Sequence, residues 1–271
     1  MIALAVLGGA FGMLIGSFLN VVVYRVPRGI SVVAPPSACG GCGTRIRWYD
    51  NVPVLSWLLL RARCRDCGSR ISVRYPLLEL GTGIAFAVVV LTTPPVAAVD
   101  LPAVLGAVAG VVGFLYLAAI TVALAAIDLD VKRLPDAIVL PAYGVGVVLL
   151  GASSFAAGDP WALARAAAGA AISFGLYLLL ALVAPGGMGF GDVKLAGVLG
   201  LFLAWLGWPV LIVGTFAPFL LGGAFAVLLL VRGAGRRTAV PFGPWMLGGA
   251  WIAILAGDGI WGAYLRMTGL A

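Results

Sequence analysis

Four cysteines form two pairs with the same internal spacing, and thiol pairs of this kind bind metal ions. They are Cys39, Cys42, Cys64 and Cys67, and 21 residues separate the two C-x2-C pairs. A spacing of two residues lets a tight turn, made easy by the glycines beside each pair, point both sulfurs at one tetrahedral ion. Four thiolates leave no open coordination position, so the pattern indicates a structural Zn²⁺ of the zinc-ribbon type. Disulfide or redox pairs and free thiols are the alternatives.

Two of the ten acidic residues stand next to long apolar runs and could form a hydrolytic pair. Asp128 follows the run that ends at Ile127, and Asp192 follows the glycine-rich stretch Gly186–Gly191. Ionisable groups at membrane depth are costly and therefore suggest function. One ionised carboxylate can activate a water while its protonated partner polarises a carbonyl. The pair predicts aspartic hydrolysis; ordinary loop acids beside an ordinary turn are the alternative.

The glycines before Asp192 fit the same chemistry. Without side chains, Gly187, Gly189 and Gly191 let a substrate backbone approach the carboxylate. We also expect Asp192 at a helix N-terminus, where the helix dipole favours a carboxylate. Asp130 and Asp136 are assigned loop or positioning roles.

The elements that position these residues must be membrane helices. Apolar residues make up 63% of the 271 residues, charged residues make up 10%, and the mean hydropathy is +1.14. A soluble domain carries roughly a quarter charged residues, so long apolar runs here predict an all-α polytopic membrane protein with about eight transmembrane helices. The expected spans are Ile2–Val23, Leu77–Val99, Leu101–Ile127, Leu134–Gly151, Trp161–Val183, Leu195–Trp208, Val210–Val231 and Trp245–Leu265. The chain has no histidine, which excludes His-based triads and zincin-type sites.

Basic residues are distributed unevenly between the two sides of these spans. With eight spans, all but two of the 17 lysines and arginines fall on the side that carries the polar segment 25–76; the exceptions are Arg165 and Arg266. Because basic loops stay in the cytoplasm, this places segment 25–76 and both predicted catalytic aspartates at the cytoplasmic face. Topology thus accounts for the net charge of +7, and no nucleic-acid partner is expected.

Several motifs, in this order along the chain, resemble those of the prepilin peptidases, also called type IV leader peptidases. The matching residues are Gly16–Pro27, the two cysteine pairs, Arg70–Pro76 with Glu79, Asp128–Asp136, and Gly189–Leu195. The resemblance covers nearly the whole chain. One departure is Ala62, which stands where the family usually has glycine before the second cysteine pair.

The resemblance implies an activity, a substrate class and a compartment. Asp128 and Asp192 would be the catalytic pair of a GxGD-type membrane protease in the inner membrane of a bacterium, embedded in the lipid bilayer. Its substrates would be prepilins or pseudopilins, cut after a glycine that precedes a hydrophobic segment. Many family members then N-methylate the new N-terminus with S-adenosylmethionine, an activity associated with the N-terminal cytoplasmic region. Further substrate or support residues would be Gly189, Gly191, Lys194, Glu79, Asn20 and Arg25.

The sequence divides into a first transmembrane helix (1–24), a cytoplasmic four-cysteine zinc module (25–76) and a transmembrane peptidase domain (77–271). Ser17, Asn20 and Arg25 at the end of the first helix could line a substrate or methyl-transfer site, or could serve polar packing between helices. Two other functions compete with proteolysis. One is an ion-coupled transporter in which Asp128, Asp192 and Glu79 form an ion path with Lys194, although no internal repeat is evident. The other is a non-catalytic scaffold whose zinc module docks a partner.

The predicted sidedness can be measured with fusion reporters. Reporters placed after Arg47, Lys132, Gly187 and Arg236 should all report the cytoplasm, and those after Asp100 and Asp159 the exterior, because basic loops are retained inside. If the Lys132 and Gly187 fusions reported opposite sides, the two carboxylates could not meet and the hydrolytic hypothesis would fail.

Overall fold

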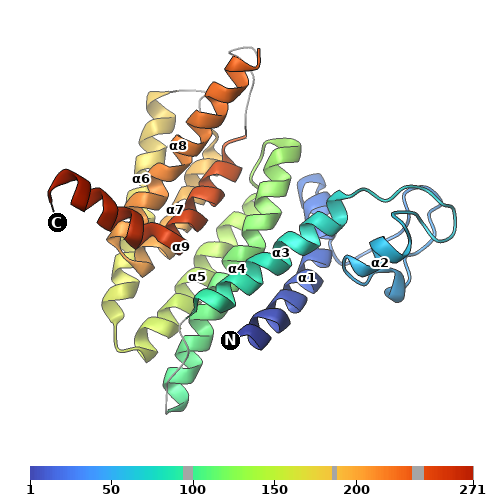
Figure 1. Cartoon of the computed structure of the whole chain (residues 1–271), viewed down its shortest axis with the longest axis horizontal. Coiled ribbons are helices and arrows are strands. Elements are labelled where there is room, and N and C mark those ends of the chain that lie inside the picture. Colours follow the sequence, from blue (N-terminus) through green and yellow to red (C-terminus); the bar gives the residue numbers. More distant parts are fainter. Residues whose placement is uncertain (94–99, 185–187, 234–240, 271) are drawn as a thin grey trace. The chain divides into compact units, whose positions relative to one another are not determined.

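The computed structural model describes residues 1–93, 100–184, 188–233 and 241–270, and the described part is almost entirely helical (Figure 1). Two single turns of 3-10 helix cover Val26–Arg28 and Trp48–Asp50. The helices are α1 (Ile2–Arg25), α2 (Leu55–Leu59), α3 (Arg74–Thr92), α4 (Leu101–Val131), α5 (Asp136–Ala156), α6 (Pro160–Val183), α7 (Phe190–Leu206), α8 (Trp208–Val231) and α9 (Gly243–Thr268).

Each of the eight predicted apolar runs coincides, over most of its described length, with one long helix, which confirms the all-α polytopic fold. Seven helices of the described ranges are long and apolar enough to cross a membrane: α1, α3, α4, α5, α6, α8 and α9. The remaining one, α7, has 17 residues and corresponds to the short sixth run. Three residues named above, Gly186, Gly187 and Arg236, lie outside the described residues, as does the end of the second run at residues 94–99.

Polar loop residues and prolines fix where several helices begin. The Asp100 carboxylate accepts the backbone N–H of Ala103 at the start of α4, and the Asp159 carboxylate accepts that of Ala162 at the start of α6. Both helices carry proline within their first two positions, where its missing N–H costs nothing. The two acids expected on the exterior side are therefore helix caps.

The chain divides into two compact units. Unit 1 comprises residues 1–96 and 114–127, and unit 2 comprises residues 97–113 and 128–271. In unit 1, α1 packs closely on α3 because glycines recur every four residues along α1. A Cβ at Gly12 would lie 2.8 Å from Phe86, and one at Gly16 would lie 2.6 Å from the Glu79 backbone. The small-residue ridge lets the two backbones approach, as is usual between helices in lipid.

In unit 2, α7 is the enclosed helix, and α5, α6, α8 and α9 all pack against it. Every residue from Leu195 to Ala204 is buried. A helix that is apolar on all faces is expected where neighbours surround it. Close packing with α6 again depends on small residues, since a Cβ at Gly200 would clash with the Gly169 carbonyl and with Ser173.

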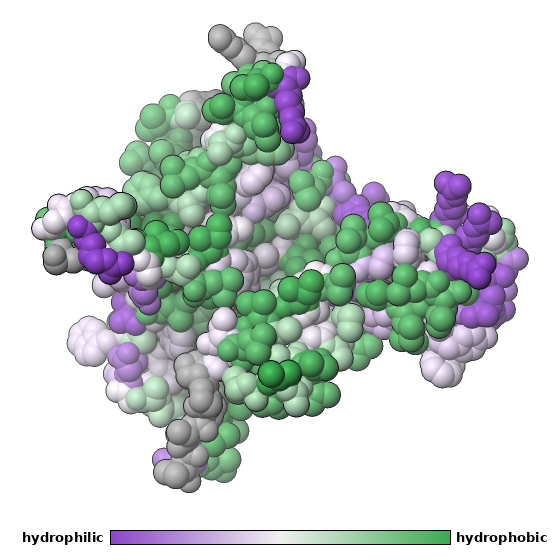
Figure 2. Space-filling view, viewed as in Figure 1, coloured by the Kyte–Doolittle hydropathy of each residue, from purple (hydrophilic) through white to green (hydrophobic). Residues whose placement is uncertain are grey.

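The segment between α1 and α3 is the polar part of unit 1. Hydrophilic residues gather over it at the right of Figure 2, whereas apolar residues cover most of the helical surface seen in that view. Apolar surface on this scale is what contact with lipid requires.

Ala62 in this segment has a left-handed backbone, with φ of +57°. Such a conformation costs an L-residue roughly 1–2 kcal/mol and costs glycine almost nothing. Because glycine also gives the unfolded chain more freedom, we expect Ala62→Gly to stabilise segment 25–76 by up to about 1 kcal/mol. Slower limited proteolysis of this segment would show it. Ala38→Gly, at a position without positive φ, should have the opposite sign; equal effects of both changes would contradict the argument.

Candidate functional site

Asp128 is buried near the C-terminal end of α4, with 4% of its surface exposed. Its Oδ2 accepts the backbone N–H of Gly243 at 3.0 Å. Gly243 is the first residue of α9, where backbone N–H groups have no partner within the helix. A Cβ at Gly243 would lie 2.7 Å from Oδ2 of Asp128, so this close approach requires glycine.

Asp192 lies in the first turn of α7, as expected, and is held by that helix's own N-terminus. The Gly189 N–H donates to Asp192 Oδ2 at 3.0 Å, and the Asp192 N–H donates to the Gly189 carbonyl at 3.0 Å. This reciprocal pair is a capping arrangement in which a carboxylate stabilises the start of a helix.

The two aspartates belong to one site in unit 2. Asp128 lies near the end of α4 and Asp192 in the first turn of α7. Leu134 lies between the backbone segments that hold them: a Cβ at Gly191 would be 3.1 Å from Leu134 Cβ, and one at Gly243 would be 3.4 Å from Leu134 Cδ2. The starts of α7 and α9 thus approach the same residue just after α4. Gly191, predicted as a support residue, is a position where a side chain would press on Leu134.

Lys194 connects the start of α7 with the start of α5. Its Nζ lies 2.7 and 2.8 Å from the two carboxylate oxygens of Asp136, and 4.9 Å from the ring centre of Phe190. The Tyr143 hydroxyl donates to the Lys194 carbonyl at 2.7 Å. Asp136, assigned a loop or positioning role from the sequence, therefore fixes the turn that carries Asp192.

The cysteine pairs form two turns of the same construction in unit 1. In each, the first cysteine N–H donates to a carbonyl five residues later, and a glycine with positive φ follows the pair: Gly43 after Cys42, and Gly68 after Cys67. One antiparallel bridge closes each turn, Ala38 with Arg45 and Arg63 with Arg70. Two such turns facing each other present four sulfurs to a common centre.

The four cysteines suit a metal ion. Their Sγ atoms all lie within 4.8 Å of one another, and those of Cys39 and Cys67 are 3.8 Å apart. A tetrahedral ion with metal–sulfur bonds of about 2.3 Å needs sulfur–sulfur separations close to this. The Ser69 hydroxyl lies 3.3 Å from Cys39 Sγ, and hydrogen bonding by Ser69 is the main cause that lowers the pKa of the Cys39 thiol to about 6. That favours the thiolate, the form that binds metal.

The other predicted support residues lie in unit 1. Asn20 Nδ2 donates to the Tyr75 carbonyl at 3.3 Å, which ties α1 to the start of α3. The Arg25 guanidinium donates to the carbonyls of Ser31 and Pro35 and shapes the chain after α1. Glu79 is buried, and its Oε2 accepts the Val54 N–H at 2.7 Å.

Two contacts could not be anticipated from the sequence. Gly243 is 115 residues from Asp128, and Val54 reaches Glu79 through an unusual backbone with φ of +59°. The sequence gives a weak signal for the contact of Gly243 with Asp128, because glycine followed by proline often opens a helix and leaves free N–H groups there. The sequence gives no signal for the contact of Val54 with Glu79, since a β-branched residue is disfavoured at positive φ.

Paired carboxylates held by helix starts among apolar helices are the arrangement expected of a polytopic membrane hydrolase of the aspartic class. Comparisons with known proteins agree. The pattern of the type IV leader peptidase family matches residues 115–227, and that of the bacterial peptidase A24 N-terminal domain matches residues 10–93. No solved structure matches the chain.

Three relatives carry the name prepilin leader peptidase/N-methyltransferase. The one from Pseudomonas putida is 38% identical over 97% of this chain and 94% of its own length. Those from Aeromonas hydrophila and Neisseria gonorrhoeae are both 36% identical, over 94% and 95% of this chain and 91% and 92% of their own lengths. This chain belongs to the type IV leader peptidase family. These names give no support to the transporter alternative.

Proposed function

We propose that this chain is a membrane aspartic endopeptidase that removes the leader of prepilins or pseudopilins and N-methylates the new N-terminus. The observation that carries the peptidase activity is the pair formed by Asp128 and Asp192, each anchored by a backbone N–H in unit 2. The near-complete coverage of relatives with this enzyme name supports both activities.

In this proposal the two carboxylates share one proton, because two like charges close together are costly. The ionised carboxylate takes a proton from water, whose oxygen attacks the scissile carbonyl carbon. The protonated partner hydrogen-bonds the carbonyl oxygen, and a proton then passes to the leaving nitrogen as the C–N bond breaks. The N–H groups of Gly189 and Gly243 hold the two side chains in place. The pair formed by Asp136 and Lys194 keeps the first turn of α7 in position.

For the second activity we propose S-adenosylmethionine as the methyl donor and unit 1 as the part that binds it. When bound, this cofactor supplies an electrophilic methyl group on a sulfonium cation. The residues suit such a group: unit 1 contains a cavity of about 640 Å³ lined by Asn20, Arg25, Tyr75 and Glu79 among others, within the size range of small-molecule sites.

We propose Zn²⁺ as the metal of the four cysteines, with a structural role. Four thiolates complete a tetrahedral shell and leave no position for water, so the ion would hold the two turns together rather than take part in hydrolysis. In a reducing compartment thiols stay available for metal, which fits a cytoplasmic location.

We also propose that segment 25–76 and the starts of α5 and α7 face the cytoplasm. The basic residues of these loops support this orientation. The first helix (1–24), the zinc module (25–76) and the start of α3 with Glu79 would then serve methyl transfer, and unit 2 would contain the peptidase site.

The metal assignment predicts that about one zinc ion co-purifies with each chain. Single changes such as Cys64→Ser should release it and make segment 25–76 faster to cleave by added protease, because the small module has few apolar contacts of its own. Elemental analysis and limited proteolysis measure both effects. A strong chelator applied to the unchanged protein should reproduce the second. A metal-free chain that stays folded and resists protease would remove the assignment.

The peptidase assignment predicts that Asp128→Asn and Asp192→Asn each abolish cleavage of a prepilin-like peptide in detergent while the protein stays folded. An amide can neither act as the base nor share the proton, so the rate should fall by at least roughly 10²–10⁴. The double variant should be no worse than either single one, because the two residues act as a unit.

Asp130→Asn and Asp136→Asn serve as matched controls, since each removes one carboxylate charge close to the site. Both should reduce cleavage less. The combination of Asp136→Asn and Lys194→Gln removes the whole ion pair, and adding it to Asp192→Asn should not restore cleavage. Near-normal cleavage by either Asp128→Asn or Asp192→Asn would refute the aspartic mechanism and leave a scaffold as the better hypothesis.

A further inference from the structure

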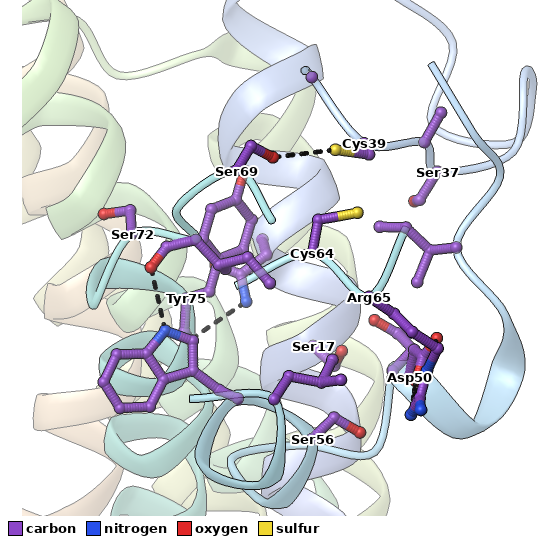
Figure 3. Close-up of a pocket in the computed structure, with 18 of the residues that line it drawn as sticks. Ser17, Ser37, Cys39, Asp50, Ser56, Cys64, Arg65, Ser69, Ser72 and Tyr75 are labelled. Atoms are coloured by element: carbon purple, nitrogen blue, oxygen red, sulfur yellow. Dashed lines mark hydrogen bonds and ion pairs between the residues drawn. The ribbon is translucent and has the colours of Figure 1, made fainter. Parts of the chain in front are cut away.

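The cavity of unit 1 lies between the ends of α1 and α3 and the cysteine module. Its volume is about 640 Å³. Ser17 and Ser56 appear at its lower side in Figure 3, with Cys39 and Ser69 at the opposite end and Tyr75 at one flank. The lining therefore joins membrane helices to the polar module within one unit.

Three carboxylates line the cavity, and two of them are already paired. Arg65 Nη2 lies 2.6 Å from Asp50 Oδ1, and this ion pair lowers the pKa of the Asp50 carboxyl. Arg47 Nη2 lies 2.9 Å from Asp66 Oδ1. Each of these two carboxylates therefore already has an arginine as its partner.

Glu79, the only glutamate of the chain, differs from these two carboxylates in its burial and in its partners. It is 8% exposed, and its Oε2 accepts a hydrogen bond from the Val54 N–H at 2.7 Å. Within the described residues, no lysine or arginine nitrogen lies within 4.0 Å of it. A buried carboxylate with a hydrogen-bond donor but no cation is a site for a positively charged group.

The backbone at Val54 is built to hold this carboxylate. Val54 has φ of +59° and ψ of −48°, an uncommon conformation for a β-branched residue. This conformation directs its N–H to Glu79 Oε2 at 2.7 Å. Backbone strain of this kind persists where the surrounding structure requires it and is frequent at ligand sites.

Apolar and aromatic groups complete the lining. Trp57 is held by a hydrogen bond from its Nε1 to the Ile71 carbonyl at 3.1 Å, and Tyr75 stands at the start of α3. Rigid aromatic rings offer flat surfaces to a heterocycle at low entropic cost. The cavity thus combines one buried negative charge with a surface for a planar ring.

We propose that this cavity is the S-adenosylmethionine site and that Glu79 is its cation-binding residue, an inference that rests on the proposed methyltransferase activity. The cofactor carries both features that the lining selects, a small organic cation and a flat purine ring. Its product, S-adenosylhomocysteine, has the same ring but has lost the sulfonium charge. Glu79 should therefore favour the charged donor over the spent product.

Equilibrium dialysis of both compounds against the full chain in detergent tests this directly. The unchanged protein should bind S-adenosylmethionine more tightly than S-adenosylhomocysteine. Glu79→Gln keeps the shape but removes the charge, and it should weaken donor binding by about tenfold or more while changing product binding by less than about threefold. Asp258→Asn is the matched control, because it removes an exposed carboxylate of α9 that does not line the cavity, and it should change neither affinity by more than about threefold.

Three results would overturn the assignment: donor binding unchanged in Glu79→Gln, equal loss of both compounds in that variant, or no binding of either compound by the unchanged protein. A peptide with the mature N-terminus that binds without cofactor and loses affinity in Glu79→Gln would assign the carboxylate to the substrate ammonium instead.

Mass spectrometry of the cleaved peptide separates this inference from the proposed function. If the unchanged protein cleaves but never methylates, the methyltransferase proposal fails. If it methylates and Glu79→Gln methylates equally well at limiting donor, only the role of Glu79 fails. Cleavage by each variant reports that the chain is folded.

Discussion

The hydrogen bond from a backbone amide at a helix start to an aspartate is the interaction on which the proposed peptidase site depends. Asp192 receives it from Gly189 before α7, and Asp128 receives it from Gly243 at the start of α9. A carboxylate among apolar helices needs such donors, because lipid and apolar side chains offer it no hydrogen bonds. Both donors are glycines, and at Gly243 a side chain would collide with the carboxylate itself.

The helices and the gathering of the four cysteines were predictable because lipid and metal ligation impose strict sequence patterns. Eight apolar runs became eight long helices, since a chain in lipid must satisfy its backbone within each segment. The spacing of Cys39, Cys42, Cys64 and Cys67 was enough to predict that the four sulfurs gather. Asp192 at a helix start followed from the glycines before it.

The contacts that position these groups were not predictable. Gly243 and Asp128 meet across 115 residues, and the partner of Lys194 is Asp136, 58 residues away. No local propensity encodes such pairs, because tertiary packing selects them. The left-handed backbones of Val54 and Ala62 are further examples: propensity argues against both, and only the surrounding fold accounts for them. The short helix α2 inside the polar segment was missed for the same reason.

The length of α7 has a consequence for where Asp192 lies along the membrane span. Seventeen residues of α-helix rise about 26 Å, whereas the hydrocarbon layer is about 30 Å thick. A lipid-facing helix would answer this mismatch by thinning the bilayer, but α7 is enclosed by protein and touches little lipid. Asp192 lies in the first turn of α7 and therefore at one end of this short helix rather than at its middle. If the proposed peptidase site is correct, hydrolysis at Asp192 would not require water to cross the whole hydrocarbon layer.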